Sequence, residues 1–434
     1  MSASPDVPKA SFRLSQLIYD TRYRSLTIQV IALALLVAAI WWLVNNTVQN
    51  LETLGKDFDF GFLTQPAGYD INQRLIDYDS QSTHGRAAMV GILNTILVAA
   101  LGCALATVLG VLAGVLRLSK NWLVSNLTAV YVEGFRNVPL LLWIILIFAI
   151  MTESTPEPRD FRGDDAAASM IVGESVAVTN RGVYIPRVGF ENSVSGAGAE
   201  WRAENTAARE AGEESPPPPS SVWDWLIVFG VLAASILGAR WNKRRADAIQ
   251  EATGDRPATW YVNLGVIVLP TLAVLLLMGA TIVAPFFRGF NFAEGIHLRN
   301  SLIALWLALA LYTGAFIAEI VRAGILSVSK GQTEAASALG LRPARTMSLV
   351  ILPQALRVII PPLISQYLNL TKNSSLAIAV GYMDVRSTLG GITINQTGRE
   401  LEGMLLLGLF YLLLSLIISA LMNVYNNAVK LKER

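Results

Sequence analysis

The sequence predicts an all-α membrane protein with about eight transmembrane helices. Hydrophobic residues make up 53% of the 434-residue chain and charged residues only 15%, whereas soluble domains carry about 25% charged residues. Long apolar runs recur along the chain, and a helix needs about 20 such residues to cross a bilayer. Lysines and arginines gather in alternate connecting segments, and this bias sets the orientation of membrane helices.

Eight segments have the length and polarity of a spanning helix. The first follows a long N-terminal tail, and no small-residue cleavage site follows Trp41 and Trp42, so we interpret it as a retained span rather than a signal peptide. The third contains Glu133 and Arg136 before its apolar part. The predicted spans are Leu26–Val44, Ala87–Leu116, Asn121–Met151, Trp223–Ala239, Tyr261–Phe287, Asn300–Leu326, Leu356–Gly381 and Gly403–Asn426.

The distribution of basic residues predicts that both termini are cytoplasmic. The basic segments are the N-terminal tail with Lys9 and Arg13, Arg117–Lys120, Arg240–Trp260, Lys330–Arg345 and the C-terminal tail. The loop Thr152–Ser221 has six basic residues against twelve acidic ones, and we expect it on the outer side. Within this loop, Glu174–Pro186 alternates in a way that favours a small hairpin, although a disordered tether fits equally well.

Composition also excludes several functions. The net charge is only +2, so the sequence gives no sign of a nucleic-acid partner. One cysteine, Cys103, and two histidines leave little for a zinc site or a disulfide framework. The chain lacks the G-x-x-x-x-G-K-[ST] phosphate loop, because its only Gly-Lys pair is Gly55-Lys56. We therefore expect this chain to bind no cofactor.

A short helix is predicted in the segment Gly331–Pro353, which we call the coupling loop. Thr333 can cap the helix, and Glu334 in its first turn suits the positive end of the helix dipole. Gly340 fits the end of the helix because it tolerates a left-handed backbone. Pro343 can then begin the next helix in its first turn. An Ala-rich connector without function would have a similar pattern.

The spacing within the coupling loop resembles a known motif. Glu334-Ala335-Ala336, three residues, Gly340, nine residues and then Val350-x-Leu352-Pro353 is similar to the EAA motif of ABC-importer permeases, in which Ile usually replaces Val350. Phe135–Leu141 and Thr371–Leu376 match the polar amino-acid (HisMQ) branch of that family. The ATPase-coupling residues that this resemblance implies are Gly331, Gln332, Glu334, Ala335, Ala336, Gly340, Leu352 and Pro353.

The remainder of the chain resembles the longer permease of general L-amino-acid importers of the Aap/Bzt type. Such a chain has a five-helix ABC-importer permease core, here with an extra N-terminal helix and an inserted two-helix block that contains Asn180-Arg181-Gly182-x-Tyr184-x-Pro186. The implied divisions are 1–86 (tail, first span and external loop), 87–151 (core, first part), 152–299 (the insert, with its acidic external loop and two spans) and 300–434 (core, second part).

The resemblance implies a transport function and several partners. The chain would be the non-enzymatic permease that moves polar L-amino acids (glutamate, glutamine, aspartate and asparagine, or a broader range) through a bacterial inner membrane into the cytoplasm. The coupling loop would dock on a separate ATPase that uses ATP and Mg²⁺. A second permease subunit, usually related but different, and a periplasmic amino-acid-binding protein would complete the importer. Membrane lipid would surround the spans.

Polar residues at membrane depth are costly and mark candidate positions on the transport path. Six of them could line a path for a zwitterionic substrate, although Glu133 and Arg136, three residues apart on one helix, could instead neutralise each other. Gly110 and Gly114 permit close helix packing, and a subunit interface is one alternative there. Pro361-Pro362 should kink or interrupt the seventh span. The candidate path residues are Glu133, Arg136, Asn137, Lys372, Asn373 and Ser374.

An ion-coupled secondary transporter is the main alternative to an ABC permease. Such transporters often contain paired polar breaks in repeated halves, and no convincing internal repeat is visible in this sequence. A membrane-bound sensor would need an output domain, and the internal loop Arg240–Trp260 is too short for one.

Overall fold

The computed structural model describes residues 21–53, 55, 58–163, 166–211 and 216–429. Lys9, Arg13, Lys56 and the C-terminal basic residues of the predictions above lie outside them. The helices are α2 (Thr21–Thr53), α3 (His84–Leu116), α4 (Trp122–Asn137), α5 (Leu140–Glu153), α6 (Gly196–Ala211), α7 (Val222–Thr253), α8 (Trp260–Leu277), α9 (Asn300–Leu326), α10 (Lys330–Ala338), α11 (Pro343–Thr346), α12 (Leu352–Asn373), α13 (Val385–Ser387), α14 (Ile394–Thr397) and α15 (Glu400–Val429).

Shorter elements connect these helices. The 3-10 turns are η1 (Gly61–Thr64), η2 (Pro158–Phe161) and η4 (Ser374–Val380), and the π-helical turns are η3 (Met347–Ile351) and η5 (Thr388–Thr393). The strands are β1 (Ala177–Thr179), β2 (Gly182–Ile185), β3 (Arg187–Phe190), β4 (Ala280–Val283), β5 (Phe286–Arg288), β6 (Asn291–Ala293) and β7 (Ile296–Arg299).

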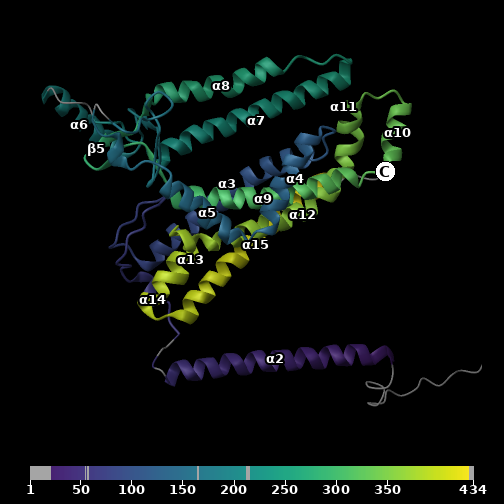
Figure 1. Ribbon diagram of the computed structural model, residues 1–434, viewed down its shortest axis with the longest axis horizontal. Helices are drawn as coiled ribbons and strands as arrows, with labels where there is room; N and C mark the ends of the chain where they lie inside the picture. Colours follow the sequence, from purple (N-terminus) through teal and green to yellow (C-terminus); the bar gives the residue numbers. More distant parts are fainter. Residues whose placement is uncertain (1–20, 54, 56–57, 164–165, 212–215, 430–434) are drawn as a thin grey trace, which may run out of the picture.

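The structure confirms an all-α membrane fold. Among the described residues, seven helical segments are long and apolar enough to span a membrane, and the bent pair α4–α5 makes eight if it counts as one span. Figure 1 shows α7 and α8 side by side along one edge of the molecule and α2 apart from the other helices. The apolar side chains of α2 are exposed along its length, which is expected of a helix that contacts lipid.

Helix α9 is the centre of the helical core. Two thirds (67%) of its most apolar stretch is buried inside the chain, a larger share than in any other described span. Helices α3, α4, α5 and α12 all pack against it. Its buried side chains include many small residues, such as Ala308, Ala310, Gly314 and Ala318, which let neighbouring backbones approach closely.

Close packing of α3 on α9 depends on two glycines. A Cβ atom on Gly110 would lie 2.5 Å from the Ile317 Cβ, and one on Gly114 would lie 2.7 Å from the Ala318 carbonyl oxygen. Neither approach is possible for a side chain without movement of the backbone. The Gly110–Gly114 pair therefore packs within this chain, which accounts for the motif without a second subunit.

The third predicted span is wrong as a single helix. Helices α4 and α5 meet at an angle of 109°. The break lies at Val138-Pro139 rather than at the charged residues, because Pro139 lacks an N–H and forces the preceding residue into an extended conformation.

Other boundaries also differ from the predicted ones. Helix α7 continues through the basic run to Thr253, because that run contains good helix formers and no proline or glycine before Gly254. Helix α8 ends at Leu277, and strands β4 and β5 replace the last part of the predicted span. Helix α12 continues through Pro361-Pro362, so these prolines do not interrupt it.

The insert, which separates the two parts of the core in the sequence, forms small antiparallel sheets. Strands β1 and β2 form the expected hairpin, with Thr179 opposite Gly182, and β7 pairs with the other edge of β2. Strand β3 pairs with β4, and β5 pairs with β6. In Figure 1, α6 and these strands lie at one end of the molecule, whereas α10, α11 and the α7–α8 connection lie at the other end. We call these the insert end and the α10 end.

Candidate functional site

Helix α10 stands out from the core at one end of the molecule (Figure 1). It begins at Lys330, one residue after Ser329, which makes no side-chain capping bond. The predicted cap at Thr333 is therefore wrong, and Glu334 lies one turn into the helix. Ala336 is the only buried residue of α10, at 4% exposure. Glu334, Ala335 and their neighbours thus leave an exposed surface of mainly small side chains.

The end of α10 follows the predicted glycine stop. Gly340 has a φ of +73°, in the left-handed region, and nothing lies within 4 Å of the position of a Cβ atom there. The Leu341 N–H donates to the Ala336 carbonyl at 3.1 Å, and the Gly340 N–H donates to the Ser337 carbonyl at 2.9 Å. These two bonds form a Schellman motif. Leu339, beside the turn, is 81% exposed and presents an apolar side chain at the tip of the loop.

The coupling loop returns to the membrane through a modified helix. Pro343 lies in the first turn of α11, as predicted. The π-helical turn η3 precedes Leu352 and Pro353 at the start of α12. Pro353 lacks an N–H and its ring crowds the carbonyl of Leu349, so a widened turn relieves the contact. Together α11, η3, α12 and η4 form one continuous candidate span.

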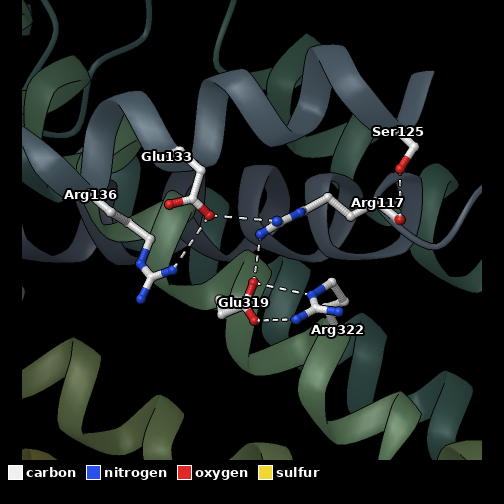
Figure 2. Close-up of polar contacts among 6 residues, drawn as sticks. All are labelled: Arg117, Ser125, Glu133, Arg136, Glu319 and Arg322. Carbon is white, nitrogen blue, oxygen red and sulfur yellow. Dashed lines mark hydrogen bonds and ion pairs between the residues drawn. The ribbon is translucent and has the colours of Figure 1, made fainter. Parts of the chain in front are cut away.

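An ionic cluster connects three core helices on the side of α10 (Figure 2). Arg117 follows the end of α3, and its Nη1 donates to Glu319 on α9 at 2.6 Å while Nη2 lies 3.5 Å from Glu133 on α4. Glu319 also pairs with Arg322 at 2.6 Å. Arg136 lies 4.0 Å from Glu133 and stacks over the ring of Phe316. The expected Glu133–Arg136 pair forms, a second i,i+3 pair forms between Glu319 and Arg322, and Arg117 joins the two.

The remaining candidate path residues lie at the end of α4, where Asn137 follows Arg136, and at the junction of α12 with η4. Asn137 and Lys372 are exposed, and Asn373 is half-buried. Ser374 is fully buried and donates to the Thr371 carbonyl at 2.7 Å. Within the described residues, no hydrogen bond or ion pair joins the Lys372–Ser374 segment to Glu133 or Arg136. The six residues thus belong to two segments, the end of α4 and the α12–η4 junction.

A polar cavity of about 210 Å³ lies where the insert meets the core. Five segments line it: the loop before α3, the end of α5, the β1–β2 turn, the β7–α9 junction and the η4–α13 junction. No carboxylate is among its described lining residues. We call it the amide pocket, and its long polar side chains are Asn72, Gln73, Asn180, Arg181, Arg299 and Asn300.

Hydrogen bonds hold the β1–β2 turn against the pocket. The Asn180 N–H donates to the Pro156 carbonyl at 2.9 Å, and Asn300 Nδ2 donates to the Asn180 carbonyl at 2.7 Å. His297 Nε2 lies 3.1 Å from the Arg181 carbonyl, and its ring stacks on Tyr184. Burial lowers the pKa of His297, as does the charge of Arg299, although the hydrogen bond to Arg181 raises it. The imidazole is therefore neutral at pH 7 and donates to this carbonyl.

Sequence reasoning missed both Arg117 and the amide pocket. Arg117 is the first charged residue after the long uncharged run of α3, and its sequence context indicates only the orientation of the spans. Asn180 and Arg181 belong to a run of residues that supported the family resemblance, yet nothing local to the sequence places them beside Arg299 and Asn300. Only the pairing of β2 with β7 brings the two segments together.

Comparisons with known proteins extend over the insert as well as the core. The family model described as "Binding-protein-dependent transport system inner membrane component" matches residues 227–431. The permease protein BztB of the glutamate/glutamine/aspartate/asparagine transport system of Rhodobacter capsulatus is 55% identical over 100% of both chains. AapQ, the general L-amino acid transport system permease protein of Rhizobium johnstonii, is 41% identical over 98% of this chain and 96% of its own.

A third relative has the same extent. The putative amino-acid ABC transporter permease protein YhdX of Escherichia coli is 41% identical over 95% of this chain and 95% of its own. Because these matches run nearly from end to end, the relatives share the length of the insert and the first helix as well as the core.

Proposed function

Because the chain belongs to the Aap/Bzt-type family of amino-acid ABC permeases, we propose that it moves polar L-amino acids across a bacterial inner membrane into the cytoplasm. Glutamate, glutamine, aspartate and asparagine are the first candidates, because BztB, the relative that is 55% identical, is named for their transport. AapQ, a general L-amino acid permease by name, supports a broader range as the alternative within the same class.

The exposed surface of α10 is the observation that most strongly supports transport driven by a separate ATPase. Helix α10 projects from the core with only Ala336 buried, so packing within this chain contributes little to its stability. Its small side chains allow a groove on another protein to approach the backbone, and Glu334 and Leu339 add one charge and one apolar contact. An ATPase subunit that docks there would move α10 and, through η3, tilt α12. ATP and Mg²⁺ would then be bound and used by that partner.

The complete importer would contain further subunits. A second permease, related but different, would complete the path, and a periplasmic binding protein would deliver the amino acid. The exposed apolar faces of α12 and α15, including Val358, Leu412 and Leu416, provide surface for lipid or for the second permease. Lys372, Asn373 and Ser374 remain candidate path residues next to that surface.

The proposed orientation puts the α10 end in the cytoplasm and the insert end in the periplasm. Its support is that the basic run within α7 reaches the α10 end, as the positive-inside rule requires. Val194 in the insert and Asp255 in the α7–α8 connection are both exposed. In a Cys103→Ser background, an impermeant thiol reagent should label Val194→Cys in intact spheroplasts and Asp255→Cys only after lysis. The reverse labelling would overturn the orientation.

The decisive experiment separates ATP-driven from ion-driven transport. The chain should be co-expressed with its neighbouring subunits, reconstituted in proteoliposomes and supplied with binding protein and labelled L-glutamine. Uptake should require internal ATP, fail with a non-hydrolysable analogue and persist when sodium and proton gradients are collapsed. Uptake that followed an ion gradient without ATP would reject the proposal in favour of a secondary transporter.

A further inference from the structure

We propose that the amide pocket binds the α-carboxylate and α-ammonium groups of a free L-amino acid before the amino acid enters the membrane path. This inference rests on the proposed function, and it assigns a site outside the coupling loop and outside the candidate path residues. The insert would then contribute directly to substrate handling, because the β1–β2 turn forms one wall of the pocket.

The charge of the pocket selects an anionic group. Arg181 and Arg299 both line the cavity, and neither forms an ion pair within the described residues. Two arginines without a carboxylate create a positive potential that favours an anion. A planar guanidinium also matches the two oxygens of a carboxylate. The positive end of the α9 dipole reinforces this potential, because α9 begins at Asn300.

The unpartnered atoms of the pocket select a second, cationic group. Within the part of the chain that the structure describes, Gln73 Oε1, Asn180 Oδ1 and Asn300 Oδ1 are buried acceptors without a hydrogen-bond partner, and Arg299 Nε is a buried donor without one. Asn300 is only 4% exposed. Buried polar groups are normally paired, since an unpaired one costs about 1–3 kcal/mol. Three neutral acceptors beside two cationic donors complement an ammonium and a carboxylate together.

The size and rigidity of the pocket suit a small zwitterion. A cavity of about 210 Å³ has the volume of roughly seven water molecules, which is enough for a small amino acid. Gly182 fixes its rim, because a Cβ atom there would lie 2.4 Å from the Leu298 carbonyl oxygen and φ is +143°. Only glycine allows the turn to approach β7 this closely, so Arg181 is held on the same cavity as Arg299.

Equilibrium binding to the intact membrane complex tests the proposal. The complex of both permeases and the ATPase, without nucleotide or binding protein, should bind labelled L-glutamine and L-glutamate. Arg181→Gln and Arg299→Gln should each raise the dissociation constant about ten-fold or more, since each removes a charge-assisted hydrogen bond. Arg181→Lys should recover part of the affinity. Arg202→Gln, which removes one exposed charge from α6 in the same insert, should leave affinity unchanged.

Competition with analogues tests the recognition of both groups. Glutarate lacks the α-ammonium group, and the amine formed by decarboxylation of glutamine lacks the α-carboxylate. Both should therefore compete for the pocket far more weakly than L-glutamine does. Equal competition by glutarate would reduce the pocket to an anion site and overturn the zwitterion assignment. Wild-type affinity in both arginine variants would overturn it as well.

Two further results separate this inference from its alternatives. If wild-type vesicles show no ATP-driven uptake, the proposed function fails, whatever the pocket binds. If uptake is present and the arginine variants keep the wild-type concentration dependence for L-glutamine, the pocket inference fails alone. If the variants instead bind L-glutamine normally but lose affinity for the binding protein, the arginines form a protein docking contact and the inference is rejected.

Discussion

The two ends of the molecule differ in how their functional features are built. At the α10 end, the exposed helix, its glycine stop and the following proline lie within one short stretch of sequence. At the insert end, the amide pocket combines five segments, from Asn72 to Met383, that are far apart along the chain. Local backbone chemistry therefore determines the first end, whereas tertiary packing of the insert on the core determines the second.

The partners of the polar groups differ in the same way. On the α10 side, Glu319 satisfies Arg117 and Arg322 within the chain. In the amide pocket, polar atoms of Arg299 and Asn300 are buried without a partner among the described residues. Charges that pair across helices can transmit movement between α3, α4 and α9, whereas buried polar atoms without partners can accept a ligand. This contrast suggests that coupling and substrate recognition are located at opposite ends of α9.

The largest expected effect is at the α10 end. Gly340→Val should abolish ATP-driven uptake and release the ATPase on purification, because a β-branched residue at this left-handed position costs about 1–2 kcal/mol and would displace the docking helix. The protein should reach the membrane in normal amount, since burial of the spans is unchanged. Uptake in vesicles and ATPase content after affinity purification measure the two effects.

A matched control for this variant exists at the same end. Gly254 ends α7 with a φ of +80°, and nothing lies within 4 Å of the position of its Cβ. Gly254→Val imposes the same backbone strain outside the coupling loop, so it should keep both the ATPase and transport. Full transport by Gly340→Val, or equal loss in both variants, would contradict a specific role for the coupling loop.

A second prediction concerns the packing that joins the two ends. Gly110→Ala should lower the stability of the whole core by about 1–3 kcal/mol, because its Cβ would lie 2.5 Å from the Ile317 Cβ. Melting in detergent should shift down, with ATPase docking and amino-acid binding lost together on heating. Gly230→Ala on α7, which meets nothing within 4 Å, should not lower the melting temperature. If heating abolished one of these two activities at a much lower temperature than the other, the two ends would not depend on the same core packing, which would contradict this prediction.

The accuracy of sequence-based prediction follows the same division. The stop at Gly340 and the start at Pro343 were predictable because each depends on the backbone of that residue alone. The cap at Thr333 and the break within the third span were misplaced, because several residues compete for each boundary and Pro139 outweighs the charged residues before it. Neither the Arg117–Glu319 pair nor the contact of the β1–β2 turn with Asn300 could be predicted, since both depend on long-range packing.

A third prediction addresses the ionic cluster. Glu319→Gln removes the negative charge and replaces one of the two oxygens that accept at 2.6 Å from Arg117 and Arg322 with an NH2 donor. These side chains are only partly exposed, so we expect a loss of about 1–2 kcal/mol. The matched control is Glu133→Gln, because Glu133 is more exposed and its contacts are longer, at 3.5 and 4.0 Å. The melting temperature should fall more in the first variant. ATP hydrolysis stimulated by binding protein should also fall there, while L-glutamine binding stays near the wild-type value.

The smallest effect is expected beside the amide pocket. Asp384 is fully buried, and its Oδ1 accepts from the Ser387 N–H and hydroxyl at 2.8 and 2.9 Å. Its Oδ2 has no hydrogen-bond partner among the residues that the structure describes. Burial raises the pKa of this carboxyl to about 6, although the bonds from Ser387 lower it. The folded state therefore binds the proton more tightly than the unfolded chain does. The resulting stabilisation is complete below pH 4 and is lost as the pH rises through about 6.

Asp384→Asn should reveal this dependence with little change in the fold. The amide oxygen can still accept from Ser387, and the variant has no charge to bury, so its melting temperature at pH 7.5 should equal or exceed that of the wild type. The advantage should shrink toward pH 5, where the wild-type carboxyl is protonated. Asp384→Ala, which loses both hydrogen bonds, should be less stable at either pH. If Asp384→Asn melts well below the wild type at pH 7.5, the charged carboxylate itself stabilises the insert end. The insert end would then contain an ionic centre of its own, and the proposed contrast with the α10 end would be wrong.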